Sequence, residues 1–247
     1  MISTTSYETI TFFGLAALFE ILERFRPAVK TDRWLNWKSD TLSFTFAILM
    51  SRVSQRLVAG PTSLYAPSWT FQTLHRLPGA LRIFLAIVIA DFIIYWIHRA
   101  QHQFTPLWRT HAWHHSVQEL YWLSGFRTSF LHSLIYNIPQ VVVPILLFHL
   151  SPFQTAIAYS IGLFIQFWEH TNLDVNIGLL RHVVITPVYH RVHHSIEHNH
   201  SNFATTFSLW DKLFGTYCDP AGVPADAQLG LGEPFGRRRA TRMLAGV

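Results

Sequence analysis

Apolar residues gather along the chain in stretches of roughly membrane-spanning length. The first covers residues 8–25, and a second has an apolar centre at 41–50 and then becomes amphipathic. The clearest runs over 81–97, and two more, at 134–150 and 153–168, are separated by a short Ser-Pro turn. A helix needs roughly 20 apolar residues to cross a bilayer core. The pattern therefore predicts an all-α integral membrane protein with about four transmembrane helices, the last two forming a tight hairpin.

Composition supports the same class. Half of the residues are hydrophobic, 15% are aromatic and only 13% are charged, whereas soluble domains carry about 25% charged residues. The single cysteine, Cys218, excludes an intramolecular disulfide, Cys-rich zinc modules and Cys-ligated iron–sulfur clusters. The basic tail RRRATRM is interpreted as a solvated or lipid-facing end, so we expect no nucleic-acid partner.

Lysine and arginine placement predicts the orientation. Segment 24–38 holds five basic residues and one acid, and ten basic residues follow residue 98. If both regions face the cytoplasm, then the N-terminus and the connection at 57–80 lie outside. The N-terminal MISTTSYETI has no basic region typical of a cleavable signal, so we expect the first apolar stretch to remain as an anchor.

Histidines carry the candidate chemistry. Fourteen of the fifteen follow residue 97, and eight of them form one HxxxH pair and two HxxHH boxes. These are His98 and His102; His111, His114 and His115; and His190, His193 and His194. On an α-helix, positions i, i+3 and i+4 share a face, so each box is expected to present several ring nitrogens in one direction. Imidazole is the commonest metal ligand near neutral pH, and eight rings would fill the coordination spheres of two metal ions.

The donor set narrows the choice of metal. Sites made of histidine without thiolates suit zinc, iron, copper or nickel, and a structural zinc needs only four ligands. Eight ligands favour a working dimetal site, and an O2-accessible site at a membrane surface favours iron, although zinc can occupy such a site in purified protein. Isolated histidines, at His75, His149 and His182, are interpreted as ordinary core or interfacial residues.

The placement of the histidines argues against two other functions. A bis-histidine cytochrome needs isolated histidines that face each other in mid-membrane, and adjacent His-His pairs do not suit it. A metal transporter or metal-storing protein would place ligands along a path through the spans, but apart from Asp91 the spans have almost none.

The motifs in order resemble the fatty acid hydroxylase/sterol desaturase superfamily of membrane diiron oxidases. The likeness covers about residues 80–217 and rests on the three histidine boxes, DFIIYWIHRAQH, FWEHTN and NFATTFSLWDKLFGTY. The linker after the first span looks most like bacterial members and the alkylglycerol monooxygenase-like branch. The resemblance implies two iron ions, O2 as co-substrate and a lipid whose C–H bond is hydroxylated. Desaturation by the same site, and a non-catalytic metal-binding protein, stay as alternatives.

The resemblance also implies ligands beyond the boxes, with His170 the best candidate and His200 the next. His198 is a weaker candidate for a ligand, and His132 is either a ligand or a capping hydrogen bonder.

Asp91 is the strongest candidate for a supporting role, because burying a carboxylate inside a membrane span costs free energy and such residues are usually functional. Asp91, Tyr95, His98 and His102 form one helical stripe, so the carboxylate could hold a ligand imidazole. The alternative for Asp91 is an ion pair with Arg82 or Arg127. Asn172, beside His170, is expected to support the site in the same way as Asp91 and Tyr95, whereas Asp211 is expected to be structural.

Three regions are expected: membrane anchor helices at 1–79, the catalytic region at 80–217 and a basic tail at 218–247. No haem motif of a fused cytochrome b5-like domain is present, so electrons are expected from a separate ferredoxin or cytochrome b5-like donor with its reductase. The histidine-rich site is expected in a helical cap on the cytoplasmic side of a bacterial inner membrane. The sequence leaves open the lipid, the choice between alcohol and alkene, and the oligomeric state.

Overall fold

The computed structural model describes residues 4–64, 74–233 and 235–247. Over these residues the chain is all-α, with no strand and three isolated β-bridges. The long helices are α1 (Thr4–Phe25), α2 (Trp37–Leu64), α4 (Gly79–Gln103), α6 (Phe130–Val142), which continues as the π-helical turn η3 (Val143–Leu147), and α7 (Pro152–His170). Short helices are α5 (Thr105–His111), η1 (His114–Ser116), η2 (Ser124–Phe126), η4 (Gly178–His182), α8 (Pro187–His194), α9 (Leu209–Phe214), η5 (Pro220–Gly222) and α10 (Arg237–Ala245).

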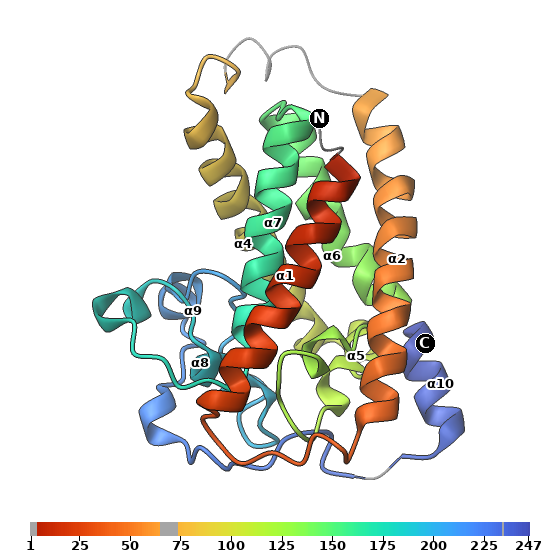
Figure 1. The fold of residues 1–247 in the computed structure, drawn as a ribbon, viewed down its shortest axis with the longest axis vertical. Coiled ribbons are helices and arrows are strands. Elements are labelled where there is room, and N and C mark those ends of the chain that lie inside the picture. Colours follow the sequence, from red (N-terminus) through yellow and green to blue (C-terminus); the bar gives the residue numbers. More distant parts are fainter. Residues whose placement is uncertain (1–3, 65–73, 234) are drawn as a thin grey trace.

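The long helices run side by side, and the short helices gather at one end of the bundle (Figure 1). Helix α1 packs on α7, α2 packs on α6, and α4 contacts both α6 and α7. A capping box at Ser151 starts α7 after a short connection from η3. Helix α6 packs chiefly on α2 and α7 chiefly on α1, so the tight hairpin of these two helices stays a prediction. The end of the bundle with the short helices contains the histidine boxes.

Within the described part of the chain, two helical segments are long and apolar enough to cross a membrane, α4 and Phe130–Leu147. The expected number of about four crossings stays a prediction. The expected outer connection at 57–80 includes residues 65–73, which lie outside the described residues.

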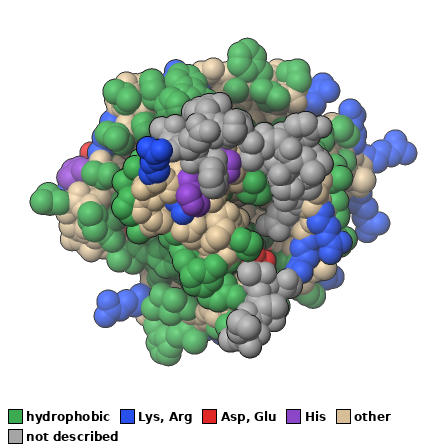
Figure 2. All heavy atoms as spheres, turned by 90° about the horizontal axis from the view of Figure 1, so that it is seen from above, with side chains coloured by type: hydrophobic (Ala, Val, Ile, Leu, Met, Phe, Trp, Pro, Cys, Tyr) green, Lys and Arg blue, Asp and Glu red, His purple; other side chains and the backbone are tan. Residues whose placement is uncertain are grey.

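The long helices combine an apolar outer surface with buried charged side chains. Large apolar side chains point outward from the long helices, including Phe13 on α1, Phe84 on α4 and Phe164 on α7. Charged side chains such as Glu23 and Asp40 are buried instead. Figure 2, which views the bundle from above, shows hydrophobic side chains over much of the described surface. This pattern favours a lipid environment around the long helices.

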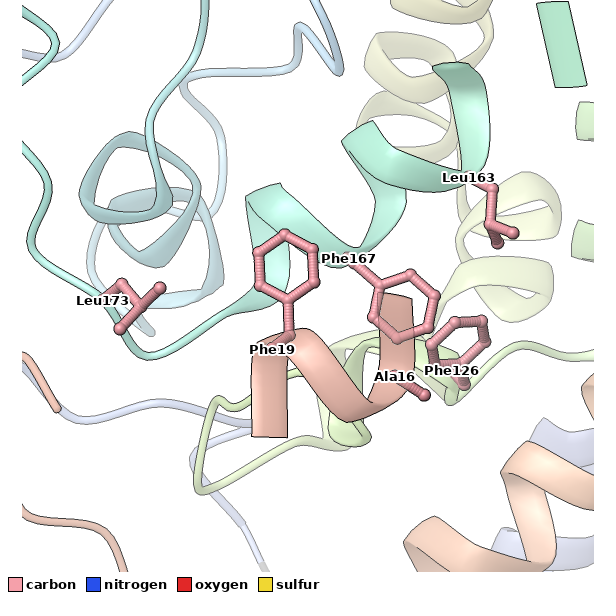
Figure 3. Packing of buried hydrophobic residues seen from close by; sticks show 6 residues of the cluster. All are labelled: Ala16, Phe19, Phe126, Leu163, Phe167 and Leu173. Carbon is pink, nitrogen blue, oxygen red and sulfur yellow. The ribbon is translucent and has the colours of Figure 1, made fainter. Parts of the chain in front are cut away.

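An aromatic cluster fixes the lower half of α1 against α7 (Figure 3). Phe19 stacks on Phe167 with ring centroids 5.6 Å apart, and Phe126 meets Phe167 edge-on at 5.0 Å. Aromatic pairs contribute about 0.5–1.5 kcal/mol beyond burial of their area. The cluster sets the position of the C-terminal turn of α7, which carries His170.

Candidate metal centre

Nine buried histidines form two adjacent groups whose ligand atoms lie within 4.8 Å of one another. The five-histidine group consists of His98, His102, His111, His115 and His193. The four-histidine group consists of His114, His170, His190 and His194. The groups adjoin, because the rings of His115 and His194 stack with centroids 4.6 Å apart.

Each HxxHH box is divided between the two groups. In α8, His190 and His194 are one turn apart and join the four-histidine group, while His193 turns to the other. In the first box, His111 ends α5 and the two following histidines lie in η1, so the box is not one continuous α-helix. The two rings at i and i+4 of each box thus point to one group, as the spacing predicts, whereas the ring at i+3 joins the other group. The division lets two short segments supply ligands to both groups.

Local sequence fixes where these segments begin. The Thr186 hydroxyl caps α8 by accepting a hydrogen bond from the backbone N–H of Tyr189 (3.2 Å), and Pro187 occupies the first helical position. Gly125 lies so close to His170 that an added Cβ would come within 2.4 Å of the ring carbon Cγ. A glycine is therefore needed where η2 meets the end of α7.

Backbone carbonyls fix the tautomers of four histidines that belong to the two groups. Their Nδ1 atoms each donate to a carbonyl oxygen: His98 to Phe203 (2.7 Å), His193 to Ser201 (2.7 Å), His114 to Arg127 (3.1 Å) and His170 to Gln166 (2.9 Å). A neutral imidazole has one N–H, so Nε2 of each ring carries a lone pair. Such outer hydrogen bonds typically orient metal-bound histidines.

The lone pairs then face one another without a proton between them. Nε2 of His114 and Nε2 of His170 are both acceptors, yet they lie 3.2 Å apart. Two nitrogens about 2.0–2.1 Å from one metal ion and at right angles to each other would be about 3 Å apart. Among the described residues, both ring nitrogens of His102 and Nε2 of His193 have no hydrogen-bond partner. The donor set therefore fits a cation in each group.

His132 controls the tautomer of a fifth ring. The Thr110 hydroxyl donates to the Leu107 carbonyl (2.7 Å), so it must accept from the Gln101 amide (2.8 Å). The same amide nitrogen lies 3.3 Å from Nδ1 of His132, which makes that atom an acceptor. His111, whose Nδ1 is 3.1 Å from it, therefore donates and keeps Nε2 for the five-histidine group. Of the two roles left open for His132, this geometry favours hydrogen bonding.

Burial keeps the box histidines outside α4 neutral. It lowers the pKa of His114 from its usual 6.5 to about 4. For His111, His115, His190, His193 and His194, burial lowers the pKa well below 6.5, and neighbouring histidines add to the effect. Neutral rings are the form that binds metal.

The expected supporting residues lie outside the two groups. Asp91 accepts hydrogen bonds from Thr205 Oγ1 (2.8 Å), the Phe207 N–H (3.2 Å) and Trp210 Nε1 (2.8 Å), so it fastens α4 to the segment around α9. Neither Arg82 nor Arg127 forms a salt bridge with it. Asp91 is thus placed to position the loop that carries Phe203.

Tyr95 and Asn172 also hold segments together. The Tyr95 hydroxyl lies 2.8 Å from Thr216 Oγ1, beyond α9. Asn172 exchanges hydrogen bonds with the backbone of Val29 (3.2 and 2.8 Å), and its Oδ1 accepts from Arg191 on α8 (3.0 Å). The expected structural role of Asp211 agrees with its bonds to Tyr189 and to the N–H groups of residues 203 and 204.

The structure does not bring His200 or His198 into either group. His200 is exposed, and its ring centroid lies 5.8 Å from that of His102. His198 Nδ1 lies 3.9 Å from Cys218 Sγ.

Sequence reasoning missed two buried carboxylates that hold the site. Asp40 forms a buried salt bridge with Arg127 (2.6 Å), whose carbonyl in turn orients His114. Glu23 accepts hydrogen bonds from the N–H groups of Trp122, before η2, and Asn172, after α7 (both 2.8 Å). The available signal was an acidic residue at either boundary of an apolar stretch: Glu23 lies near the end of 8–25, and Asp40 directly precedes 41–50.

Comparisons with known proteins agree on one family. A sequence model of the family described as Fatty acid hydroxylase matches residues 83–216, more than half of the chain. The ornithine lipid hydroxylase OlsE of Rhizobium tropici is 26% identical over 93% of this chain and 76% of its own length. No solved structure matches.

Two further relatives are longer proteins. The alkylglycerol monooxygenase of Xenopus tropicalis is 34% identical over 72% of this chain and 41% of its own length. A probable Delta(7)-sterol 5(6)-desaturase of Neurospora crassa is 26% identical over 78% of this chain and 54% of its own length. The chain thus spans only about half of each.

Proposed function

The chain belongs to the fatty acid hydroxylase family, and from that premise we propose that it is an O2-dependent diiron oxygenase that hydroxylates a C–H bond of a membrane lipid. Its relatives are hydroxylases, monooxygenases and desaturases, so it is an oxidoreductase. The observation that carries the proposal is the division of nine neutral histidines into two adjoining groups.

The two groups would hold one iron ion each. When bound, the irons supply O2 activation and the removal of hydrogen from an unactivated C–H bond. The chain's own part is to present neutral imidazole lone pairs, fix their tautomers through carbonyls and exclude bulk water. Eight of the nine rings are at most 5% exposed, with His102 at 7%. The overall reaction takes a C–H bond, O2, two electrons and two protons to an alcohol and water.

Two features support a lipid substrate. The apolar outer faces of α1, α4 and α7 suit contact with acyl chains, and the similar proteins are named for ornithine lipids, alkylglycerols and sterols. Fatty acyl, sterol or hopanoid, carotenoid and alkyl ether groups are the candidate classes. Desaturation is the second candidate, because desaturases are among the relatives.

We further propose that the site faces the cytoplasm, in a bacterial inner membrane. The basic segment at 24–38 and the basic tail lie at the same end of the bundle as the histidines, which supports this orientation. A separate ferredoxin or cytochrome b5-like protein with its reductase would supply the two electrons.

The test is oxygen transfer from labelled O2. Iron-loaded protein in nanodiscs of total bacterial lipid receives reductant and a ferredoxin with its reductase, and lipids are then analysed by mass spectrometry. We expect one lipid class to gain one labelled oxygen atom, dependent on both O2 and reductant. Loss of two hydrogens without oxygen gain would indicate desaturation instead. A metal-loaded, reduced protein that consumes no O2 with any lipid class would contradict the proposal.

A further inference from the structure

A small polar cavity opens at the surface directly beside the five-histidine group. Its volume is about 180 Å³, and it is lined by His102, Gln103, Thr105, Trp108, Asn199 and His200. We propose that this cavity is the route by which a divalent metal ion enters and leaves the five-histidine group, with His200 as a transient ligand at its mouth. The inference rests on the metal centre of the proposed function.

His102 joins the cavity to the metal group. Its side chain is only 7% exposed, yet both ring nitrogens have no hydrogen-bond partner among the described residues. The same residue belongs to the five-histidine group and lines the cavity. A buried imidazole with two unused nitrogens can therefore meet a cation that arrives from the solvent side.

The mouth of the cavity offers weaker, exposed ligands. His200 is exposed and lies 5.8 Å from His102 between ring centroids, a distance at which an ion can pass from one ring to the next. The half-buried Asn199 adds an amide. Since a water molecule takes up about 30 Å³, the cavity has room for an ion that has kept part of its hydration shell.

Contact with the cavity distinguishes the two metal groups. His102 of the five-histidine group lines the cavity, whereas no member of the four-histidine group does. An ion in the five-histidine group should consequently exchange faster than one in the four-histidine group. His200 would set the rate of that exchange without adding to the number of ions held at equilibrium.

The test follows metal release from the full-length protein in detergent. Zinc-loaded protein is mixed with a chromogenic chelator, and release is recorded together with metal content before mixing. We expect a fast and a slow phase of one ion each. His200→Ala should slow the fast phase several-fold while zinc content stays at the wild-type value. Asn199→Trp, which fills the cavity, should slow both release and uptake of that ion.

His182→Ala is the matched control, because His182 is also exposed but lies on η4, away from the cavity; its release kinetics should equal those of the wild type. An unchanged fast phase in both cavity variants would overturn the proposal. Loss of one zinc ion in His200→Ala would overturn it too, because His200 would then be a resident ligand. A wild-type protein that holds no metal would instead refute the metal centre itself.

Discussion

At the scale of single residues, the position of one proton on each ring decides what the site can bind. His98, His114, His170 and His193 donate from Nδ1 to carbonyl oxygens and keep Nε2 free. These carbonyls belong to the backbone of Phe203, Arg127, Gln166 and Ser201, none of which is in either histidine group. Metal affinity should therefore respond to residues that touch no metal.

His132 gives the clearest test of this dependence. His132→Leu removes the acceptor for His111 Nδ1, and the loss of such an outer partner typically costs about 10–100-fold in metal affinity. His132→Asn, whose side-chain oxygen can accept the same hydrogen bond, should restore most of the affinity. Competition with a chelator of known affinity measures the metal affinity of both variants. Loss of one full metal equivalent in the Asn variant as well would mean that His132 is itself a ligand.

Gly125 tests the close approach to His170. In Gly125→Ala the new Cβ would lie 2.4 Å from Cγ of the ring, near its attachment to the backbone, so the ring must move. We expect metal content to fall by the ion of the four-histidine group. Gly162→Ala, with nothing within 4 Å of the added carbon, is the control on α7 and should keep both ions. Equal metal content in the two variants would contradict the assigned geometry.

The sequence predicted much at this scale. Histidine spacing identified the eight box residues, and the resemblance added His170. The sequence could not predict which group each ring of the first box joins, because the direction of those rings depends on the break between α5 and η1. His200 was expected to be a ligand from its place after the third box, but exposure and distance to His102 depend on how the 195–201 turn folds back.

At the scale of elements, buried charges tie the long helices to the histidine groups. Asp40, at the start of α2, bonds to the Arg127 guanidinium (2.6 Å) and accepts from the Tyr121 hydroxyl (2.7 Å). Arg127 also donates to the Ser116 carbonyl in η1 (3.0 Å). Through these contacts α2 holds the loop that carries His114.

Removal of Asp40 should be costly. Asp40→Ala leaves a guanidinium buried without its counter-charge, and breaking a buried pair in this way typically destabilises a protein by about 3–5 kcal/mol. We expect a lower thermal midpoint in detergent and weaker metal retention. Glu233→Ala, which breaks the exposed pair with Arg239, should cost about 0–1 kcal/mol. Similar midpoints for the two variants would show that the buried pair does not hold α2 in place.

Helix periodicity predicted the elements better than their connections. The five apolar stretches correspond to α1, α2, α4, α6 with η3, and α7. Ion pairs between distant elements, such as Asp40 with Arg127, have no local signature. Asp91 was expected near a ligand ring from its stripe on α4, but its partners come from residues 205–210, more than a hundred positions away.

At the scale of the whole molecule, an apolar exterior surrounds a buried set of neutral histidines. Burial lowers the pKa of His114 from 6.5 to about 4, and it lowers those of the other box histidines outside α4 as well. Above about pH 6.5 the rings are neutral in both folded and unfolded chains. Between about pH 6.5 and 4 the unfolded chain binds more protons, so stability falls as the pH drops.

The metal-free protein in detergent should therefore lose thermal stability continuously as the pH is lowered from about 6.5 towards 4. Thermal midpoints recorded by circular dichroism at a series of pH values measure the effect. A midpoint that rises over this interval would mean that the buried rings are charged in the folded state.

The most direct test of the account is the number of metal ions per chain in iron-supplemented wild type, His193→Ala and His194→Ala. These neighbours belong to different groups. We predict two ions in the wild type, loss of metal in each variant, and no lipid oxygenation by either variant, while membrane insertion is kept. One ion or none in the wild type, or full iron content in both variants, would contradict the paired metal centre.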